Sequence, residues 1–432
     1  MNKINVGIIG FGTVGSGTAE VLLAQAATLS RKTNLDINLK TVAVRKATKL
    51  PEKFANCRLT LNPDDICNDP EIDIVVELIG GIEPAKTIIL KAIEAGKHVV
   101  SANKALFSTH GRQIFEAATR KGVEVGFEAS VGGGIPVIKA LKEGLAANTI
   151  QSIMGIMNGT ANYILSQMTD HGLAFDMVLK DAQAKGYAEA DPTYDIEGID
   201  TAHKLVILMS MAYGINIRLE DVSIEGISRI EPIDIEFARQ FGCRIKLLAI
   251  SRNHGDHIEA RVHPTMVPED HLLANINGAM NGINFNGDMV GNVLFYGQGA
   301  GKMATGSAVV ADIVDIARNV AFKCVGRVPS LAYLPSEIKD CVITPMEKIR
   351  CPYYFRISAV DKPGVLATIA GILGKNGISI ESVIQKRRQD VGAVPVVIRT
   401  HEAQEKAVSE AINEINSLDI VTEKTVTIRI LE

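Results

Sequence analysis

The feature that most constrains the fold is a glycine-rich segment near the N-terminus, VGIIGFGTVGSG. It places Gly10, Gly12 and Gly15 in a G-x-G-x-x-G pattern, directly after an apolar run typical of a buried strand and directly before a helical pattern. In such a turn the first glycine permits a tight bend, the second lets the backbone approach a pyrophosphate, and the third allows close helix packing. The anion then lies at the helix N-terminus. The motif alone is weak, and a glycine-rich turn that binds nothing is the alternative.

Short apolar runs and helical patterns alternate through the first third of the chain, which indicates a doubly wound parallel sheet of the Rossmann type. In this context the glycine turn is a predicted dinucleotide site, with Phe11, Thr13 and Val14 between the glycines. NAD is typically held by an acidic residue at the end of the second strand, but Arg45 and Lys46 stand there. A cationic pair favours a 2′-phosphate, so we predict NADP over NAD, with a solvated basic turn as the alternative.

Composition excludes several classes of partner. The 45 Lys and Arg residues nearly balance 49 Asp and Glu, so nothing electrostatic favours nucleic acid or an anionic membrane. No apolar stretch reaches the roughly 20 residues that a membrane span requires. The six cysteines show no C-x-x-C spacing, which argues against a zinc site or a disulfide framework. We therefore expect a cytoplasmic protein that acts on small molecules.

A chain of 432 residues is expected to form two or three domains. After about residue 130 the pattern changes to mixed strands and longer helices, and near residue 351 it restarts in a βαββαβ order. We expect a nucleotide-binding domain over 1–130 together with about 299–330, a central α+β domain over 131–298, a linker over 331–350 and a small module over 351–432. The basic run from Lys386 to Arg388 is typical of a solvated hairpin turn.

Acidic residues concentrate in the stretch GYAEADPTYDIEGIDTAHK, which ends with Asp200 and Lys204 at helical spacing. The commonest use of that spacing is a surface ion pair. The apolar run that follows, Leu205 to Met209, instead indicates a buried helix, and buried charges need partners or a purpose. Beside a nicotinamide, an ammonium group can deliver a proton to a carbonyl oxygen as hydride reaches the carbon, while a carboxylate orients it.

This stretch resembles the corresponding segment of homoserine dehydrogenases. The resemblance covers nearly the whole chain, because GFGTVG, VVSANKALFSTHG, FEASVGGGIP, MNGTANYIL and YGQGAGKMATGSAVVADI occur in that family's order. It implies reversible hydride transfer between NAD(P)H and L-aspartate 4-semialdehyde, which gives L-homoserine. It also implies that the central domain is catalytic and joins the chains of a homodimer or homotetramer.

The resemblance implies roles for individual residues. Lys204 would be the proton donor and Asp200 its partner, while Lys104 would sit between cofactor and substrate; the alternative for Lys104 is a surface lysine at a helix start. The residues expected to hold the substrate are Glu189, Asp195, Gly159 and Thr160. Ser101 and Gly301 would extend the cofactor site.

FEASVGGGIP resembles the family's loop for a monovalent cation. By that similarity Glu128 and the backbone carbonyls of Val131, Gly133 and Ile135 would face an ion such as sodium, and glycines allow carbonyls to converge. The alternative is a flexible connection between domains. Ala304 and Gly306 depart from the family pattern, which has proline and alanine there, and this predicts a looser loop facing the cofactor.

The C-terminal segment VDKPGVLATIAGILGKNGISIESV resembles an ACT domain, a regulatory fold that commonly binds amino acids. The resemblance places the ligand at Asp361, Gly364, Asn376 and Gly377, with threonine as the expected effector. The alternative is a module that serves only dimerisation.

Two rival functions stay open at the level of sequence. Another ACT-tailed dehydrogenase, such as a phosphoglycerate dehydrogenase, would pair a histidine with a carboxylate for acid-base chemistry. A catalytically inactive amino-acid sensor would have lost the reactive side chains, yet all of them are present here.

Overall fold

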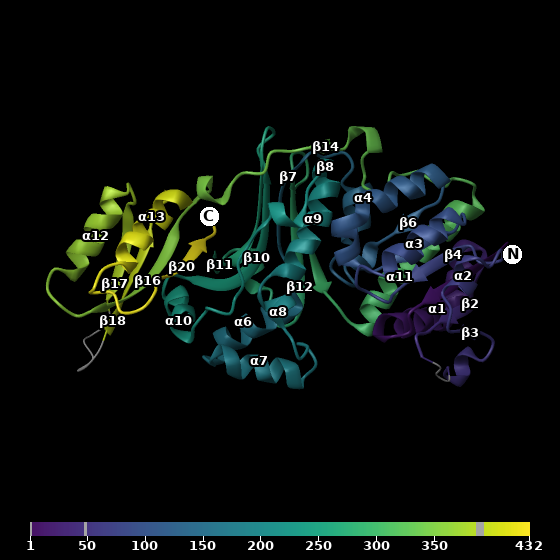
Figure 1. The fold of residues 1–432 in the computed structure, drawn as a ribbon, viewed down its shortest axis with the longest axis horizontal. Helices are drawn as coiled ribbons and strands as arrows, with labels where there is room; N and C mark the ends of the chain where they lie inside the picture. Colours follow the sequence, from purple (N-terminus) through teal and green to yellow (C-terminus); the bar gives the residue numbers. More distant parts are fainter. Residues whose placement is uncertain (1, 47–49, 386–392) are drawn as a thin grey trace. The chain divides into compact units, whose positions relative to one another are not determined.

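A computed structural model describes residues 2–46, 50–385 and 393–432 (Figure 1). The predicted hairpin at Lys386 to Arg388 lies outside these described residues. The chain forms two compact units, each assembled from three separate stretches. The first contains Met1–Ile153, His203–Asp221 and Asn281–Cys341, and the second contains Met154–Ala202, Val222–Met280 and Val342–Glu432.

The first unit is built on a parallel sheet of six strands in the order β3-β2-β1-β4-β5-β6. The strands are β1 Asn2–Ile9, β2 Leu35–Ala43, β3 Arg58–Thr60, β4 Ile74–Glu77, β5 His98–Ser101 and β6 Val125–Gly126. The strand order reverses between β1 and β4, which is the arrangement of doubly wound nucleotide-binding sheets. The fold class predicted for the first third of the chain is confirmed.

Helices cover this sheet, and one of them comes from far along the chain. The longer helices of the unit are α1 Thr13–Thr33, α3 Ala85–Glu94, α4 Lys104–Lys121 and α11 Lys302–Ala321, with short turns at α2 Asp64–Cys67 and α5 Val137–Lys139. Helix α11 buries Val309, Ile313 and Ala317 in the core that also contains Ile8 and Val76. Because these α11 residues recur every four positions, they share one face of the helix.

Helices α1 and α11 lie side by side (Figure 1) and meet at two glycines. A Cβ on Gly17 would lie 2.2 Å from the Lys302 carbonyl oxygen, and one on Gly306 would lie 2.8 Å from the Gly17 carbonyl carbon. Only glycine permits this approach. Ala304 and Gly306 therefore belong to a packed helix, and the prediction of a looser loop at these positions was wrong.

The second unit contains a long antiparallel pair, β10 Cys243–Asn253 and β11 Ile258–Pro268, whose side chains are almost continuously buried. Its helices before this pair are α6 Gly159–His171, α7 Phe175–Ala184, α8 Thr193–Ile196 and α10 Pro232–Gln240. Helix α9, Ile199–Tyr213, begins in this unit and belongs to the first unit from His203 on. It is the predicted buried helix, and every residue from Thr201 to Met209 is buried. The first unit's N-terminal stretch ends within β7 Ile150–Ile156, and β12 Met280–Gly287 and β13 Gly291–Gln298 belong to the first unit except for Met280.

The C-terminal module follows the predicted βαββαβ order. Its elements are β16 Tyr353–Val360, α12 Val365–Lys375, β17 Ile380–Gln385, β18 Ala393–Thr400, α13 Glu405–Asn416 and β20 Val426–Ile430. The strands pair as β20-β16-β18-β17, and α12 and α13 share a core with them (Figure 1). Strand β20 also pairs in parallel with β11, with Arg429 opposite Thr265, so the module's sheet continues into the long pair.

Short paired strands complete the fold. β8 Ile215–Asn216 pairs with β14 Lys339–Asp340, β9 Ser223–Ile224 pairs with β11, and β15 Arg350–Cys351 pairs with β19 Ala403–Gln404. No helix within the described residues is both long and apolar enough to span a membrane.

Candidate active site

The glycine turn after β1 has the geometry that dinucleotide binding requires. Gly10 has φ +102°, and a Cβ there would lie 2.6 Å from the Leu78 carbonyl oxygen. A Cβ on Gly15 would lie 2.0 Å from the Gly10 carbonyl oxygen, so the first turn of α1 packs closely against the end of the strand. Around Gly12, by contrast, no described atom lies within 4 Å of such a Cβ. The open side of the turn is therefore at Gly12.

The N-terminus of α1 is available to an anion. Gly12 is the N-cap residue of α1 and has no side chain that could accept from the free N–H groups. The first turn of the helix, all of whose residues are described, carries no acidic residue. Thr13 is exposed, Val14 is half-buried, and Phe11 packs edge-on against Phe54 with ring centroids 5.8 Å apart. Free backbone N–H groups and the helix dipole both favour negative charge at this end. A pyrophosphate fits the cradle.

The basic pair Arg45 and Lys46 lies beside the glycine turn. Both residues are exposed and follow the end of β2, which pairs in parallel with β1. Because carboxyl ends of parallel strands meet at one edge of the sheet, the pair and the turn share that edge. The position suits contact with the ribose that follows the pyrophosphate.

A hydrogen-bonded cluster orders the next two strand ends on the same edge. Glu77, fully buried at the end of β4, accepts from Ser101 Oγ at 2.7 Å, and Ser101 Oγ accepts from the Asn103 N–H at 3.1 Å. Asn103 caps α4 by accepting from the Leu106 N–H at 3.2 Å. This cap fixes the start of α4, where Lys104 is the first residue and is only partly exposed.

Helix α9 connects to α4 inside the first unit. His203 is 6% exposed, and its Nδ1 is hydrogen-bonded to Ser108 Oγ. Ser108 lies one turn after Lys104, and His203 immediately precedes Lys204. The hydrogen bond therefore fixes the relative orientation of the two helices that carry the predicted catalytic lysines.

The predicted catalytic pair is buried. Asp200 is 1% exposed and Lys204 is 7% exposed, one turn apart on α9. The alternative reading as a surface ion pair is therefore excluded. An ionised group without solvent is stabilised only by specific partners, which is typical of functional positions.

Asn158 is hydrogen-bonded to two of the predicted acidic residues. Its Nδ2 donates to Asp195 Oδ1 at 2.7 Å and to Asp200 Oδ2 at 2.8 Å, while its Oδ1 accepts from the Ala161 N–H. One amide thus caps α6 and joins α8 to α9. Sequence reasoning missed Asn158, although it directly precedes the predicted Gly159 and Thr160.

Other predicted substrate residues are arranged around this cluster. Thr160 Oγ1 donates to the Tyr187 carbonyl at 2.6 Å, which ties α6 to the loop that carries the exposed Glu189. A Cβ on Gly159 would lie 2.7 Å from the Ala279 carbonyl oxygen, so glycine is required there. Burial raises the pKa of Tyr194, and the charges of Asp200 and Asp195 add to the effect. Tyr194, also missed, therefore lies close to both acids.

The predicted cation loop contains two glycines with positive φ and a glutamate whose carboxylate is already hydrogen-bonded. Gly132 and Gly133 have φ +71° and +55°, and a Cβ on Gly133 would lie 2.4 Å from the Gly299 carbonyl oxygen. Glu128 Oε1 and Oε2 each accept a backbone N–H at 2.8 Å, from Ile138 and Lys139. The Glu128 carboxylate therefore orders the backbone that follows the loop. Among the described residues, no group of three or more His, Cys, Asp or Glu is placed to hold a metal ion.

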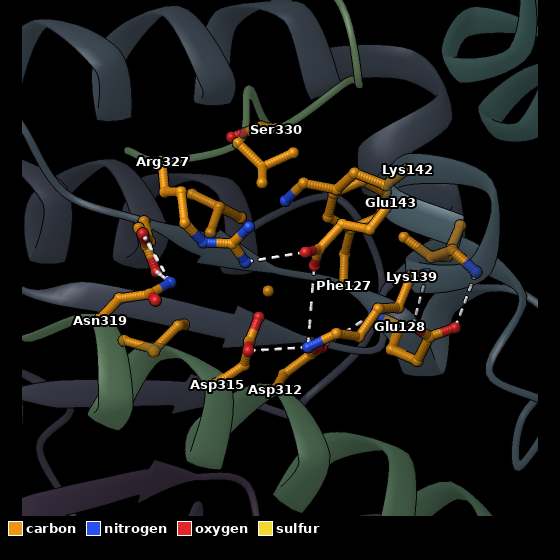
Figure 2. A pocket seen from close by; sticks show the side chains of 16 residues that line it. Phe127, Glu128, Lys139, Lys142, Glu143, Asp312, Asp315, Asn319, Arg327 and Ser330 are labelled. Carbon is orange, nitrogen blue, oxygen red and sulfur yellow. Dashed lines mark hydrogen bonds and ion pairs between the residues drawn. The ribbon is translucent and has the colours of Figure 1, made fainter. Parts of the chain in front are cut away.

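A charged pocket adjoins the loop (Figure 2) and was not foreseen. Asp312 of α11 accepts the Glu128 N–H through Oδ2 at 2.8 Å. A Cβ on Gly126 would lie 2.7 Å from the Asp312 Cβ, so glycine leaves room for this carboxyl group. Burial, followed by the charge of Glu128, raises the pKa of Asp312 to about 8. Burial also lowers the pKa of the nearby Lys142.

The predicted effector residues fall into two groups. Gly364, with φ +91°, precedes α12, and Asp361 lies just before it. Asn376 caps the other end, where Gly377 has φ +71°. The 11 residues of α12 span about 16 Å, so one chain does not bring the four residues to a single small ligand.

A dinucleotide cradle at one sheet edge, in a chain that also buries a lysine one helical turn from an aspartate, suits hydride transfer at a carbonyl. Fold and site thus define an NAD(P)-dependent dehydrogenase. Comparison with known proteins agrees. Family models match as homoserine dehydrogenase over residues 136–314, homoserine dehydrogenase NAD binding domain over 10–128 and ACT domain over 353–419. The chain belongs to the homoserine dehydrogenase family, and its activity is that of a homoserine dehydrogenase.

Relatives match over the full length. The chain is 48% identical to homoserine dehydrogenase from Pseudomonas aeruginosa, covering 100% of this chain and 99% of the relative. A crystal structure of a homoserine dehydrogenase from Thiobacillus denitrificans matches with a TM-score of 0.94 and 50% identity, covering 100% and 99%. A hyperthermophilic archaeal homoserine dehydrogenase in complex with NADPH matches with a TM-score of 0.62 and 25% identity, covering 73% and 98%. An inactive sensor and a different ACT-tailed dehydrogenase are not favoured.

Proposed function

We propose that this enzyme interconverts L-homoserine and L-aspartate 4-semialdehyde, with Lys204 as the group that exchanges a proton with the substrate oxygen. The observation that carries this role is the burial of Asp200 and Lys204 on α9. A bound nicotinamide supplies or accepts the hydride. Lys204 gives its proton to the carbonyl oxygen in the reducing direction and receives it in the oxidising direction.

Asp200 and Lys104 position this chemistry. Asp200, held by Asn158 Nδ2 at 2.8 Å, keeps a negative charge one turn from Lys204 and favours the protonated ammonium form. Lys104, at the capped start of α4, would lie between cofactor and substrate. Its charge would stabilise the developing alkoxide, as positive groups do at such centres.

The substrate's ammonium group would be held by Asp195 and Glu189. Asp195 is fixed through Asn158, whereas Glu189 is exposed on the loop tied to Thr160. Gly159 and Thr160, at the start of α6, would present the helix N-terminus to the substrate carboxylate. The two ends of the amino acid would thus meet opposite charges.

The cofactor would lie along the sheet edge defined by Gly10, Gly12 and Gly15, continued by Ser101 and Gly301. NADP would be preferred, because Arg45 and Lys46 are exposed and can hydrogen-bond a 2′-phosphate. The NADPH complex of the archaeal relative supports this preference. A cation such as sodium would be held by the carbonyls of Val131, Gly133 and Ile135 and would order the loop.

Regulation by threonine would act through the C-terminal module. The groups at the two ends of α12 can serve one ligand only if ends from two chains meet, which supports an effector site formed in a homodimer or homotetramer. The domain limits given above and a cytoplasmic location belong to the same proposal.

The testing experiment combines purified protein with L-homoserine and either NADP⁺ or NAD⁺ in sodium buffer and follows reduced nicotinamide by absorbance. We expect reduction with homoserine, faster with NADP⁺, and none with L-serine. The double variant Arg45→Ala, Lys46→Ala should raise the KM for NADP⁺ by about tenfold, since charge-assisted hydrogen bonds are lost. A second exposed basic pair, Arg31 and Lys32 at the far end of α1, serves as the control. Equal effects of the two double variants would refute the 2′-phosphate contact.

A further inference from the structure

We propose that a second, separate site in this enzyme binds a small anion between β10, β11 and the C-terminal strand β20. The residues that line the pocket are Ile250, Arg252, Arg261, His263, Thr265, Arg350, Cys351, Arg429, Ile430, Leu431 and Glu432. All of them belong to the second unit. None has a part in the dehydrogenase chemistry or lies on α12.

Arg261 is the residue that most needs an anion. The residue is 3% exposed, its Nε has no hydrogen-bond partner among the described residues, and its Nη1 has only an ion pair. Its ion pair with Glu259 joins Nη1 and Oε2 at 3.3 Å, while Glu259 Oε1 bonds His254 at 2.9 Å. Burial lowers the pKa of Arg261, which means that its charge is poorly solvated. A buried guanidinium with unused donors is costly unless an acceptor reaches it.

Four arginines line the pocket, and the only acidic side chain among the described lining residues is Glu432. Three of the arginines already have carboxylate partners, because Arg429 is held by Glu405 and Glu225, Arg350 by Glu402, and Arg261 by Glu259. Arg252 makes no ion pair within the described residues. The groups open to an anion are therefore Arg252 and the unbonded Nε of Arg261.

His263 adds a polar group without adding charge. It is 2% exposed, and Nε2 has no hydrogen-bond partner within the described part of the chain. Nδ1 lies 3.0 Å from the Pro264 carbonyl and 3.0 Å from Thr265 Oγ1. Burial, with the positive charges of Arg429 and Arg261, holds the pKa of His263 well below its usual range. The imidazole is therefore neutral and adds no charge to the pocket.

The size of the pocket limits the ligand. Its free volume is about 20 Å³, enough for roughly one water-sized group. Chloride or the carboxylate end of a small acid can enter, whereas a nucleotide cannot. Since Arg261 lies on β11 and Arg429 on the adjacent β20, the anion would stabilise the junction between the long strand pair and the C-terminal module.

The test measures thermal unfolding of the full-length enzyme at constant ionic strength while chloride, or separately acetate, replaces the bulky anion gluconate. We expect a saturable rise in the unfolding midpoint of about 2 °C or more. A response to chloride and not to acetate identifies a halide site, and a response to both identifies a carboxylate-accepting site. Arg261→Gln should abolish the response, and the exposed control Arg218→Gln should keep it. An equal response of Arg261→Gln and the unchanged enzyme would overturn the proposal.

Two further measurements test the anion site without relying on Arg261→Gln, in case that variant does not fold. Glu432→Gln removes the acidic side chain of the lining and should tighten chloride binding severalfold. Crystals of the unchanged enzyme soaked in bromide should show an anomalous peak within hydrogen-bond reach of Arg261. Absence of that peak at saturating bromide would refute the site.

Discussion

The Asp312 carboxyl group on α11 accepts the backbone N–H of Glu128 at 2.8 Å, which joins the late helix to the loop predicted to hold a cation. The residues are 184 positions apart in sequence. Figure 2 shows both side chains in one pocket with Lys139, Lys142 and Asp315. The Glu128 carboxylate in turn holds the backbone after the loop.

The raised pKa of Asp312 predicts a pH-dependent stability. The folded state binds this proton more tightly than the unfolded chain does, since its pKa rises from 3.8 to about 8. The contribution is therefore complete below about pH 4 and is lost as pH rises through 8. In Asp312→Asn the free energy of unfolding should fall less steeply over this interval, by up to about 1 kcal/mol per pH unit.

Chemical denaturation at a series of pH values measures this difference. Asp315→Asn is the matched control, because Asp315 lies on the same helix but in a partly exposed ion pair with Lys139. An unchanged pH slope in Asp312→Asn would contradict the buried, protonated carboxyl group.

Replacing Lys204 or Glu189 by alanine should change different kinetic parameters. Lys204→Ala removes a group that acts in the transition state, so kcat should fall by about a hundredfold or more with little change in KM. Glu189→Ala removes a contact to the substrate's ammonium group and should mainly raise the KM for homoserine. Steady-state kinetics in the oxidising direction measure both, with the exposed Lys180→Ala as control. Similar profiles for the two variants would contradict the division of roles.

The side chain of Asn158 should have to be uncharged for the enzyme to turn over. Replacing it by aspartate keeps the shape but puts a third carboxylate against Asp195 and Asp200, which lie 2.7 Å and 2.8 Å from its Nδ2. We expect kcat to fall by about a hundredfold or more, since the repulsion displaces Asp200. The exposed Asn275→Asp is the control. Near-normal turnover of Asn158→Asp, measured on folded protein, would refute the bridge.

Gly17 should tolerate no side chain. Gly17→Ala puts a Cβ 2.2 Å from the Lys302 carbonyl and must separate α1 from α11, at a cost of about 2 kcal/mol in the free energy of unfolding. The KM for NADP⁺ should also rise, because α1 begins at the glycine turn. Gly371→Ala, a helical glycine with open space in the described structure, should cost nothing. Equal stability of the two variants would disprove the close helix crossing.

Local patterns in the sequence determined several features of this enzyme. The glycine spacing from Gly10 to Gly15, the alternation of strands and helices, the buried helix after Asp200 and the βαββαβ module are all confirmed. Each depends on residues that are near one another in the chain, because turn geometry and helical or strand periodicity are local properties. Family resemblance added the reaction, which local patterns alone did not give.

Tertiary structure decided the features that depend on distant residues. It brought Asp312 to Glu128, Gly306 to Gly17, and Arg429 beside the strand that carries Arg261. It also made Asn158 the link between two acids and separated Gly364 from Asn376. No local periodicity encodes such contacts, because they arise only when helices and strands pack and bury their polar groups together. The pairing of those groups in space, which sets their charge and their pKa, is therefore a property of the folded chain.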